Sequence, residues 1–84
     1  MMYFVYVLQD LESKKLYTGY TKDLDRRQNE HNSNRVYTTS RYADKKLIFY
    51  EAFISKEDAI RREKYLKTTN GKRALKLMLK KSIK

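Results

Sequence analysis

Two tyrosines and an arginine lie at spacings that suit chemistry on a phosphate. Tyr6 and Tyr17 are eleven positions apart, and Arg27 follows ten positions after Tyr17. Hydroxyl groups can orient or deprotonate a water molecule, and a guanidinium can stabilise the negative charge that develops when a phosphate is attacked. The 84 residues carry a formal net charge of +10, which favours a polyanionic partner. The combination points to chemistry on DNA phosphodiesters.

The composition narrows the class of protein. Lysine and arginine total 20 against 10 acidic residues, so nucleic acid is the first expected partner and an acidic membrane surface the second. The absence of cysteine excludes disulfides and thiolate metal sites, and one histidine makes a structural zinc site a poor fit. Residues 1–8 form the longest mainly apolar run, far short of the roughly 20 residues that span a bilayer. We expect a single domain over residues 1–84, cytoplasmic and without a membrane segment.

Residues 2–9 and 16–20 predict the two strands of a β-hairpin. The first strand has apolar side chains on both alternating faces, which is typical of a central strand covered on both sides. A turn centred between residues 11 and 12 would place Tyr6 directly opposite Tyr17, with Cβ atoms about 5 Å apart.

Gly19 lies inside the second of these strands and is one of only two glycines in the chain. A glycine weakens a strand unless a bulge or a close approach of another group requires it. Two interpretations therefore remain open: the strand ends early, or another group needs the space that a side chain would fill.

The remaining sequence predicts one more strand and three helices, which gives an α+β domain with the order β-β-α-β-α-α. Asp23 is suited to cap the first helix, and Ser55 with Asp58 suggests a capping box for the second. In chain order we expect a helix over 23–34, a polar loop over 35–45, a strand over 47–54, and helices over 56–67 and 72–82, the last strongly basic.

The first expected helix has a single strongly apolar residue, Leu24, which should face the sheet. Arg27 and His31 follow at i+3 and i+7, so they share a helix face with Leu24. Two basic side chains would then point at the tyrosine-bearing strands. In the alternative, the helix docks loosely, Arg27 pairs with Glu30 and His31 is exposed.

Glu63 poses a similar question in the second helix. It lies on the apolar stripe formed by Ala59, Ile60 and Leu66. A carboxylate on a core-facing stripe is costly to desolvate unless it is paired or binds a cation. Either Arg27 or a metal ion could satisfy it, and the sequence leaves both open.

Four separate parts of the chain form a pattern: Val5-Tyr6-Val7, Tyr17-Thr18-Gly19, Arg27 and Glu63. This pattern resembles the GIY-YIG nuclease superfamily. Within the superfamily the chain is most similar, over about residues 2–75, to small stand-alone bacterial proteins related to the nuclease domain of the excision-repair incision subunit. The resemblance implies a three-stranded antiparallel sheet flanked by helices, with Val5 and Val7 in place of the usual glycine and isoleucine.

The resemblance also implies a role for each site residue in Mg²⁺-dependent cleavage of nucleic acid, with Mn²⁺ as a substitute ion. Tyr17 matches the tyrosine that activates the attacking water, and Tyr6 matches the tyrosine that positions the water and the phosphate. Arg27 matches the arginine that stabilises the transition state, and Glu63 matches the metal ligand. His31 corresponds to a histidine that assists proton transfer in part of the family.

Basic residues around this site form the expected nucleic-acid-binding surface. They contact phosphates, which gives affinity without sequence information. Together with the backbone at Gly19, this surface comprises Lys22, Arg26, Arg35, Arg41 and Lys72.

Three functions are compatible with these residues. The first is a metal-dependent endonuclease that cleaves DNA in a structure-selective or weakly specific way, with RNA as an alternative substrate. The second is a non-catalytic nucleic-acid-binding module on the same fold. The third is a subunit that becomes active only with a protein partner or as a homodimer.

Overall fold

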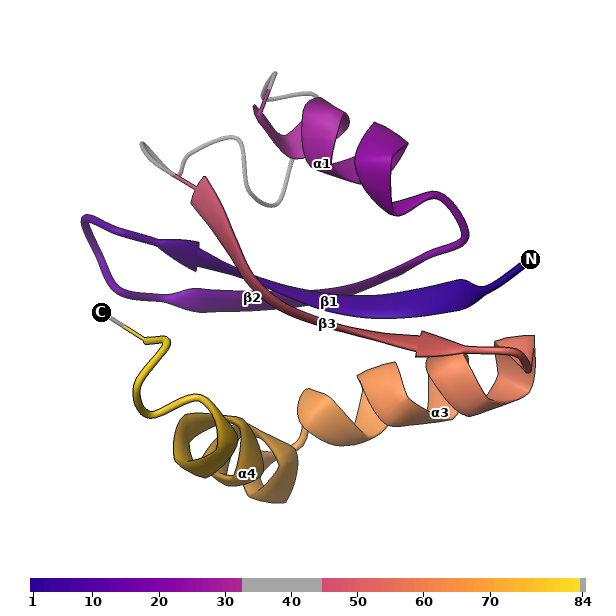
Figure 1. Ribbon diagram of the computed structural model, residues 1–84. Coiled ribbons are helices and arrows are strands. Elements are labelled where there is room, and N and C mark those ends of the chain that lie inside the picture. The colour runs from indigo at the N-terminus through magenta and orange to yellow at the C-terminus, as the bar shows by residue number, and fades with distance from the viewer. Residues whose placement is uncertain (33–44, 84) are drawn as a thin grey trace.

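The computed structural model describes residues 1–32 and 45–83, and in these it contains three strands and three helices (Figure 1). The order β-β-α-β-α-α agrees with the sequence prediction. The expected loop, with Arg35 and Arg41, falls almost entirely outside the described residues. The elements are β1 (Tyr3–Asp10), β2 (Leu16–Thr21), α1 (Leu24–Asn32), β3 (Lys45–Phe53), α3 (Lys56–Leu66) and α4 (Thr69–Met78).

The three strands form one antiparallel sheet in the order β2-β1-β3. β1 is therefore central, as predicted. Its alternating residues Val5, Tyr6, Val7 and Leu8 are all buried, since both faces of the sheet are covered. Helix α1 lies on one face, and α3 and α4 lie on the other (Figure 1). None of these helices is long and apolar enough to cross a membrane.

The hydrophobic core lies between the sheet and the α3–α4 pair. It is formed by residues from β1 and both helices, namely Val5, Val7, Ala59, Leu66, Leu75 and Leu79. The side chain of Arg62 ties α3 to β3 by donating from Nε and Nη2 to the two oxygens of Glu51, at 2.9 and 3.3 Å. The opposite face of the sheet, under α1, carries Tyr6 and lies outside this core cluster.

The predicted register of the β1–β2 hairpin is wrong by two residues. Tyr6 pairs with Gly19, and Tyr17 pairs with Leu8. The turn is longer than expected because Lys14 adopts a left-handed conformation with φ of 67°, and because the Asp10 carboxylate accepts a 2.6 Å hydrogen bond from the Ser13 hydroxyl. A shift by two residues preserves the alternation of faces, so Tyr6 and Tyr17 still share one face of the sheet.

A glycine is needed at position 19 because the Tyr6 ring lies directly over it. The strand continues past it to Thr21, so the early-ending interpretation is wrong. A Cβ atom at Gly19 would lie 2.9 Å from Cε1 of Tyr6 and closer still to the Tyr6 hydroxyl, which is nearer than side-chain atoms pack. The glycine therefore provides the space in which the Tyr6 side chain lies.

Side-chain caps start the helices. As predicted, Asp23 Oδ1 accepts from the N–H of Arg26 at 3.1 Å. Ser55 Oγ accepts from the N–H of Asp58 at 3.3 Å, which is one of the two hydrogen bonds of the predicted capping box. The last helix departs from prediction: it begins at Thr69, because Thr68 caps it by accepting from the N–H of Gly71 at 3.0 Å, and it ends at Met78. Gly71 lies in the first turn of this helix and lets it pass close to the backbone of Tyr65.

The variant Gly19→Ala should be destabilised by about 1 to 3 kcal/mol, because the added methyl group overlaps the Tyr6 ring. Urea unfolding would measure the loss. In a Tyr6→Leu background, which removes the ring, the same substitution should cost less. Equal costs in the two backgrounds would contradict the close approach.

Candidate active site

A buried hydrogen bond joins α1 to the central strand. Tyr6 Oη and His31 Nε2 are 2.9 Å apart, and the two side chains are 2% and 0% exposed. The predicted helix face of Leu24, Arg27 and His31 thus points toward the sheet, and the alternative of an exposed His31 is wrong. Since burying a polar ring is unfavourable unless it is hydrogen-bonded, the two side chains depend on each other.

Burial fixes the protonation states of both groups. It raises the pKa of the Tyr6 hydroxyl to about 12, although the hydrogen bond from Arg27 acts in the opposite direction. It lowers the pKa of His31 to about 4, and the positive charges of Arg27 and Lys45 add to this effect. At neutral pH His31 is therefore an uncharged ring and Tyr6 keeps its proton. We assign the Tyr6 hydroxyl as donor and His31 Nε2 as acceptor.

Tyr17 completes a cluster of three rings. Its ring stacks beside the Tyr6 ring, with centroids 6.3 Å apart. It is nearly perpendicular to the His31 ring, with centroids 5.2 Å apart and an interplanar angle of 84°. Unlike the other two side chains, Tyr17 is only partly buried. It is therefore the member of the cluster that solvent or a ligand can reach.

Arg27 lies between the ring cluster and an acid on its own helix. Its Nε donates to Tyr6 Oη at 3.4 Å, and its Nη1 lies 3.1 Å from Glu30 Oε1. Arg27 therefore faces the tyrosine-bearing strands and also pairs with Glu30, two arrangements that the sequence left as alternatives. The positive charge of Arg27 thus lies near the Tyr6 and Tyr17 side chains, and this arrangement is suited to binding a phosphate.

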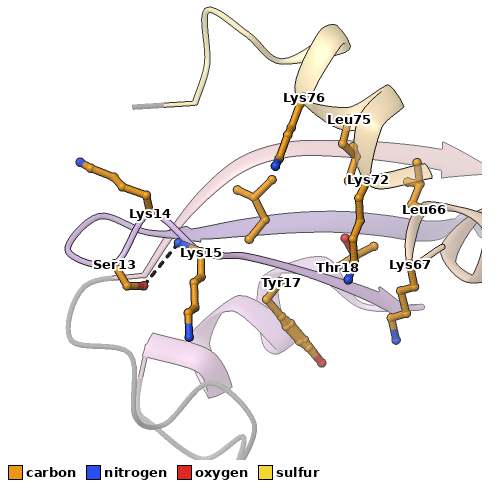
Figure 2. Close-up of a pocket in the computed structure, with 11 residues that line it drawn as sticks. Ser13, Lys14, Lys15, Tyr17, Thr18, Leu66, Lys67, Lys72, Leu75 and Lys76 are labelled. Carbon is orange, nitrogen blue, oxygen red and sulfur yellow. Dashed lines mark hydrogen bonds between the residues drawn. The ribbon is translucent and has the colours of Figure 1, made fainter. Parts of the chain in front are cut away.

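Glu63 has a partner that neither sequence alternative named. Its Oε2 lies 2.9 Å from Lys67 Nζ, one helical turn further along, and its side chain is 18% exposed. The alternative in which Arg27 pairs with Glu63 is wrong, because the Arg27 guanidinium contacts Glu30 and Tyr6 instead. Lys67 in turn lines a groove with Tyr17 and Thr18 (Figure 2), which connects the ion pair with the exposed tyrosine.

Glu63 suits only one kind of metal site. Among residues 1–32 and 45–83, no three acidic, histidine or cysteine side chains gather closely enough to cage an ion. Mg²⁺ often binds through one or two carboxylates, with water and substrate phosphates filling the other positions. A partly exposed single carboxylate fits this open, substrate-completed type of site and not a closed protein cage.

The predicted cationic residues are spread over two places. Lys22 and Arg26 are exposed near the start of α1, where Arg26 pairs with Glu30 at 3.4 Å. Lys72 lies in the groove beside Tyr17. Sequence reasoning missed Lys67 and Lys15 in that groove. Both had a signal, since Lys67 is one helical turn from Glu63 and Lys15 lies two positions before Tyr17.

His31 is the single histidine of the chain, so its titration can be followed without ambiguity by NMR. We expect a midpoint near pH 4 instead of the usual 6.5. Because the unfolded chain binds this proton at higher pH than the folded chain, stability should fall between pH 6.5 and 4, by up to about 3 kcal/mol from this group. A midpoint near 6.5 would contradict the buried, neutral imidazole.

Known proteins match this chain over most of its length. Residues 2–76 match the GIY-YIG catalytic domain. The chain is 38% identical over 85 residues to a UPF0213 protein of Clostridium perfringens, covering 99% of this chain and 89% of that one. A UPF0213 protein of Streptococcus agalactiae is 44% identical over 66 residues, or 76% and 73% of the two chains.

The fold matches a solved structure as well. The solution NMR structure of a UPF0213 protein from Bacillus halodurans is similar with a TM-score of 0.58 and 36% identity, over 93% of this chain and 85% of that one. The family match spans nearly the whole chain, including both tyrosines, Arg27 and Glu63. The chain therefore belongs to the GIY-YIG family of nuclease domains.

Proposed function

We propose that the protein is a metal-dependent endonuclease that hydrolyses DNA phosphodiester bonds in a structure-selective or weakly specific way. One observation carries the proposal: the Arg27 guanidinium, 3.4 Å from the Tyr6 hydroxyl, adjoins a ring cluster that leaves Tyr17 accessible, in a nuclease domain. Phosphoryl transfer depends mainly on positioning and on charge placed where the transition state develops it. The cluster offers both.

The two tyrosines have different roles in this proposal. Tyr6 is buried and, with a pKa of about 12, stays protonated at neutral pH. Its hydroxyl is suited to positioning and not to taking up a proton. Tyr17, which is partly exposed on the same sheet face, is assigned to the attacking water. His31 accepts from Tyr6 and orients it, so we assign His31 to positioning instead of proton transfer.

Arg27 is assigned to the charge of the transition state. Its contacts with Glu30 and Tyr6 hold the guanidinium in place before substrate arrives, and a preorganised charge needs no rearrangement during the reaction. Its side chain is 37% exposed, so part of the guanidinium remains accessible to a phosphate.

Glu63 is assigned to the metal. A Mg²⁺ ion, or Mn²⁺ in its place, would act as a Lewis acid on the phosphate oxygens. The Glu63 carboxylate would hold the ion, in exchange for its present contact with Lys67. Lys67 would then be released toward the same anionic substrate.

The Glu63–Lys67 ion pair also favours a second candidate, a non-catalytic nucleic-acid-binding module. The pair neutralises the carboxylate without a metal, so Glu63 alone does not require one. A binding module needs the cations of the surface but not the acid. Cleavage assays with a Glu63 variant separate the two candidates.

Purified protein incubated with single-stranded, duplex, flap and four-way DNA should cleave at least one of them with Mg²⁺ or Mn²⁺ and none with EDTA. Glu63→Gln should lower the rate by at least about 100-fold, since the ion would lose its protein ligand. The matched control Glu57→Gln removes an exposed carboxylate from the same helix and should leave the rate unchanged. Binding without cleavage by either protein would favour the non-catalytic module.

Tyr17→Phe should lower the rate by about 100- to 10,000-fold while leaving stability nearly unchanged. Tyr6→Phe should lower the rate and also destabilise the fold by about 1 to 3 kcal/mol, because the buried hydrogen bond between Tyr6 and His31 is lost. The control Tyr20→Phe changes a tyrosine on the other face of β2 and should be active. Full activity of Tyr17→Phe would rule out its assignment to the attacking water.

A further inference from the structure

A groove lies along the open edge of the sheet, beside Tyr17 and outside the ring cluster. β2 is an edge strand, and the space between it and α4 has a volume of about 740 Å³. We call this space the β2–α4 groove. It is lined by residues 13–18 of the hairpin, by Leu66 and Lys67 at the end of α3, and by Lys72, Leu75 and Lys76 of α4 (Figure 2).

The charge of the β2–α4 groove has one sign. Among the described residues that line it, five are lysines and none is acidic. Lys67 shares its charge with Glu63, whereas Lys14, Lys15, Lys72 and Lys76 are exposed. Clustered ammonium groups attract a polyanion, and a lysine on a flexible stem binds phosphate without demanding a fixed geometry.

The groove crosses the edge of β2 and reaches both faces of the sheet. Leu16 and Thr18 belong to the face covered by α4, while Lys15 and Tyr17 belong to the face covered by α1, and all four line the same space. Figure 2 shows Lys72 and Lys76 extending from α4 toward β2, with the Tyr17 ring on the other side of the strand. A chain lying in the groove would thus pass from α4 to Tyr17.

The floor of the groove is apolar. Leu66 and Leu75 are nearly fully buried beneath it, and Leu16 packs against the same core. Hydroxyl groups are supplied by Ser13 and Thr18. Cations at the walls with few hydrogen-bonding groups between them are suited to contacts with phosphates, which position a strand but do not read its sequence.

We propose that the β2–α4 groove binds the sugar-phosphate backbone of the DNA strand to be cut and leads it to Tyr17. The inference rests on the proposed nuclease function and adds the path of the substrate to it. A single backbone path along one sheet edge, lined by point charges, accounts for weak sequence preference. It also gives the lysines of α4 a role beyond solubility.

The test uses the double variant Lys72→Gln/Lys76→Gln, with Lys46→Gln/Lys56→Gln as a control that makes the same change in net charge. Lys46 lies on β3, at the far edge of the sheet, and Lys56 begins α3; neither lines the groove. All four side chains are exposed, so folding should be unaffected, which circular dichroism would verify. Binding to a fluorescent single-stranded oligonucleotide is measured in EDTA over a range of salt concentrations.

The groove variant should bind about tenfold more weakly, with a salt-dependence slope reduced by about 1.4, as expected when two phosphate contacts to a single strand are lost. The control variant should keep the affinity and the slope of the wild-type protein. Equal weakening of both variants would overturn the inference, because net charge alone would then explain binding. Unchanged binding by the groove variant, or no binding by the wild-type protein, would overturn it too.

A parallel cleavage assay with Mg²⁺ separates this inference from the proposed function. If the wild-type protein cleaves DNA and the groove variant binds normally, the groove inference fails and the nuclease proposal stands. If the groove variant alone loses binding but no protein cleaves DNA, the groove is a binding track and the nuclease proposal fails.

Discussion

The hydrogen bond between Tyr6 and His31 is the contact on which the candidate site depends. Helix α1 offers the sheet one strongly apolar side chain, Leu24, so little hydrophobic burial holds it in place. Instead, two polar rings are buried against each other at 2.9 Å. Separating the helix from the sheet would break this hydrogen bond and the ring contacts of His31 with Tyr6 and Tyr17. The pair therefore fixes the position of the helix that carries Arg27.

The same hydrogen bond determines which groups of the site donate and which accept. Neutral His31 accepts a hydrogen bond from the Tyr6 hydroxyl, and the Tyr6 oxygen can then accept a hydrogen bond from Arg27. Tyr6 can lie this deep only because Gly19, opposite it in the sheet, has no side chain. Tyr17 then stacks on the outer side of the cluster and remains accessible. The buried pair thus gives the two tyrosines different properties: Tyr6 is fixed and protonated, and Tyr17 is accessible.

Local patterns predicted the elements and the helix faces but not the contacts made between elements. The alternation in β1 and the i, i+3, i+7 spacing in α1 correctly placed the tyrosines and His31 toward each other. The hairpin register failed because the turn length depends on the conformation of Lys14. The predicted start of α4 was wrong because Thr68 caps the helix, and because Gly71, which packs closely on the backbone of Tyr65, lies inside it. Such tertiary contacts have no periodic signal in the sequence.

The most direct test of the account follows Arg27 itself. NMR of the arginine Nε–H groups, in a complex with Mg²⁺ and a phosphorothioate oligonucleotide that resists hydrolysis, reports whether a phosphate reaches this guanidinium. The account predicts a large shift of the Arg27 signal, together with shifts of the Tyr17 ring, and a small change at Arg61, an exposed arginine on α3. Binding that leaves Arg27 and Tyr17 unchanged would contradict the assignment of this cluster as the active site.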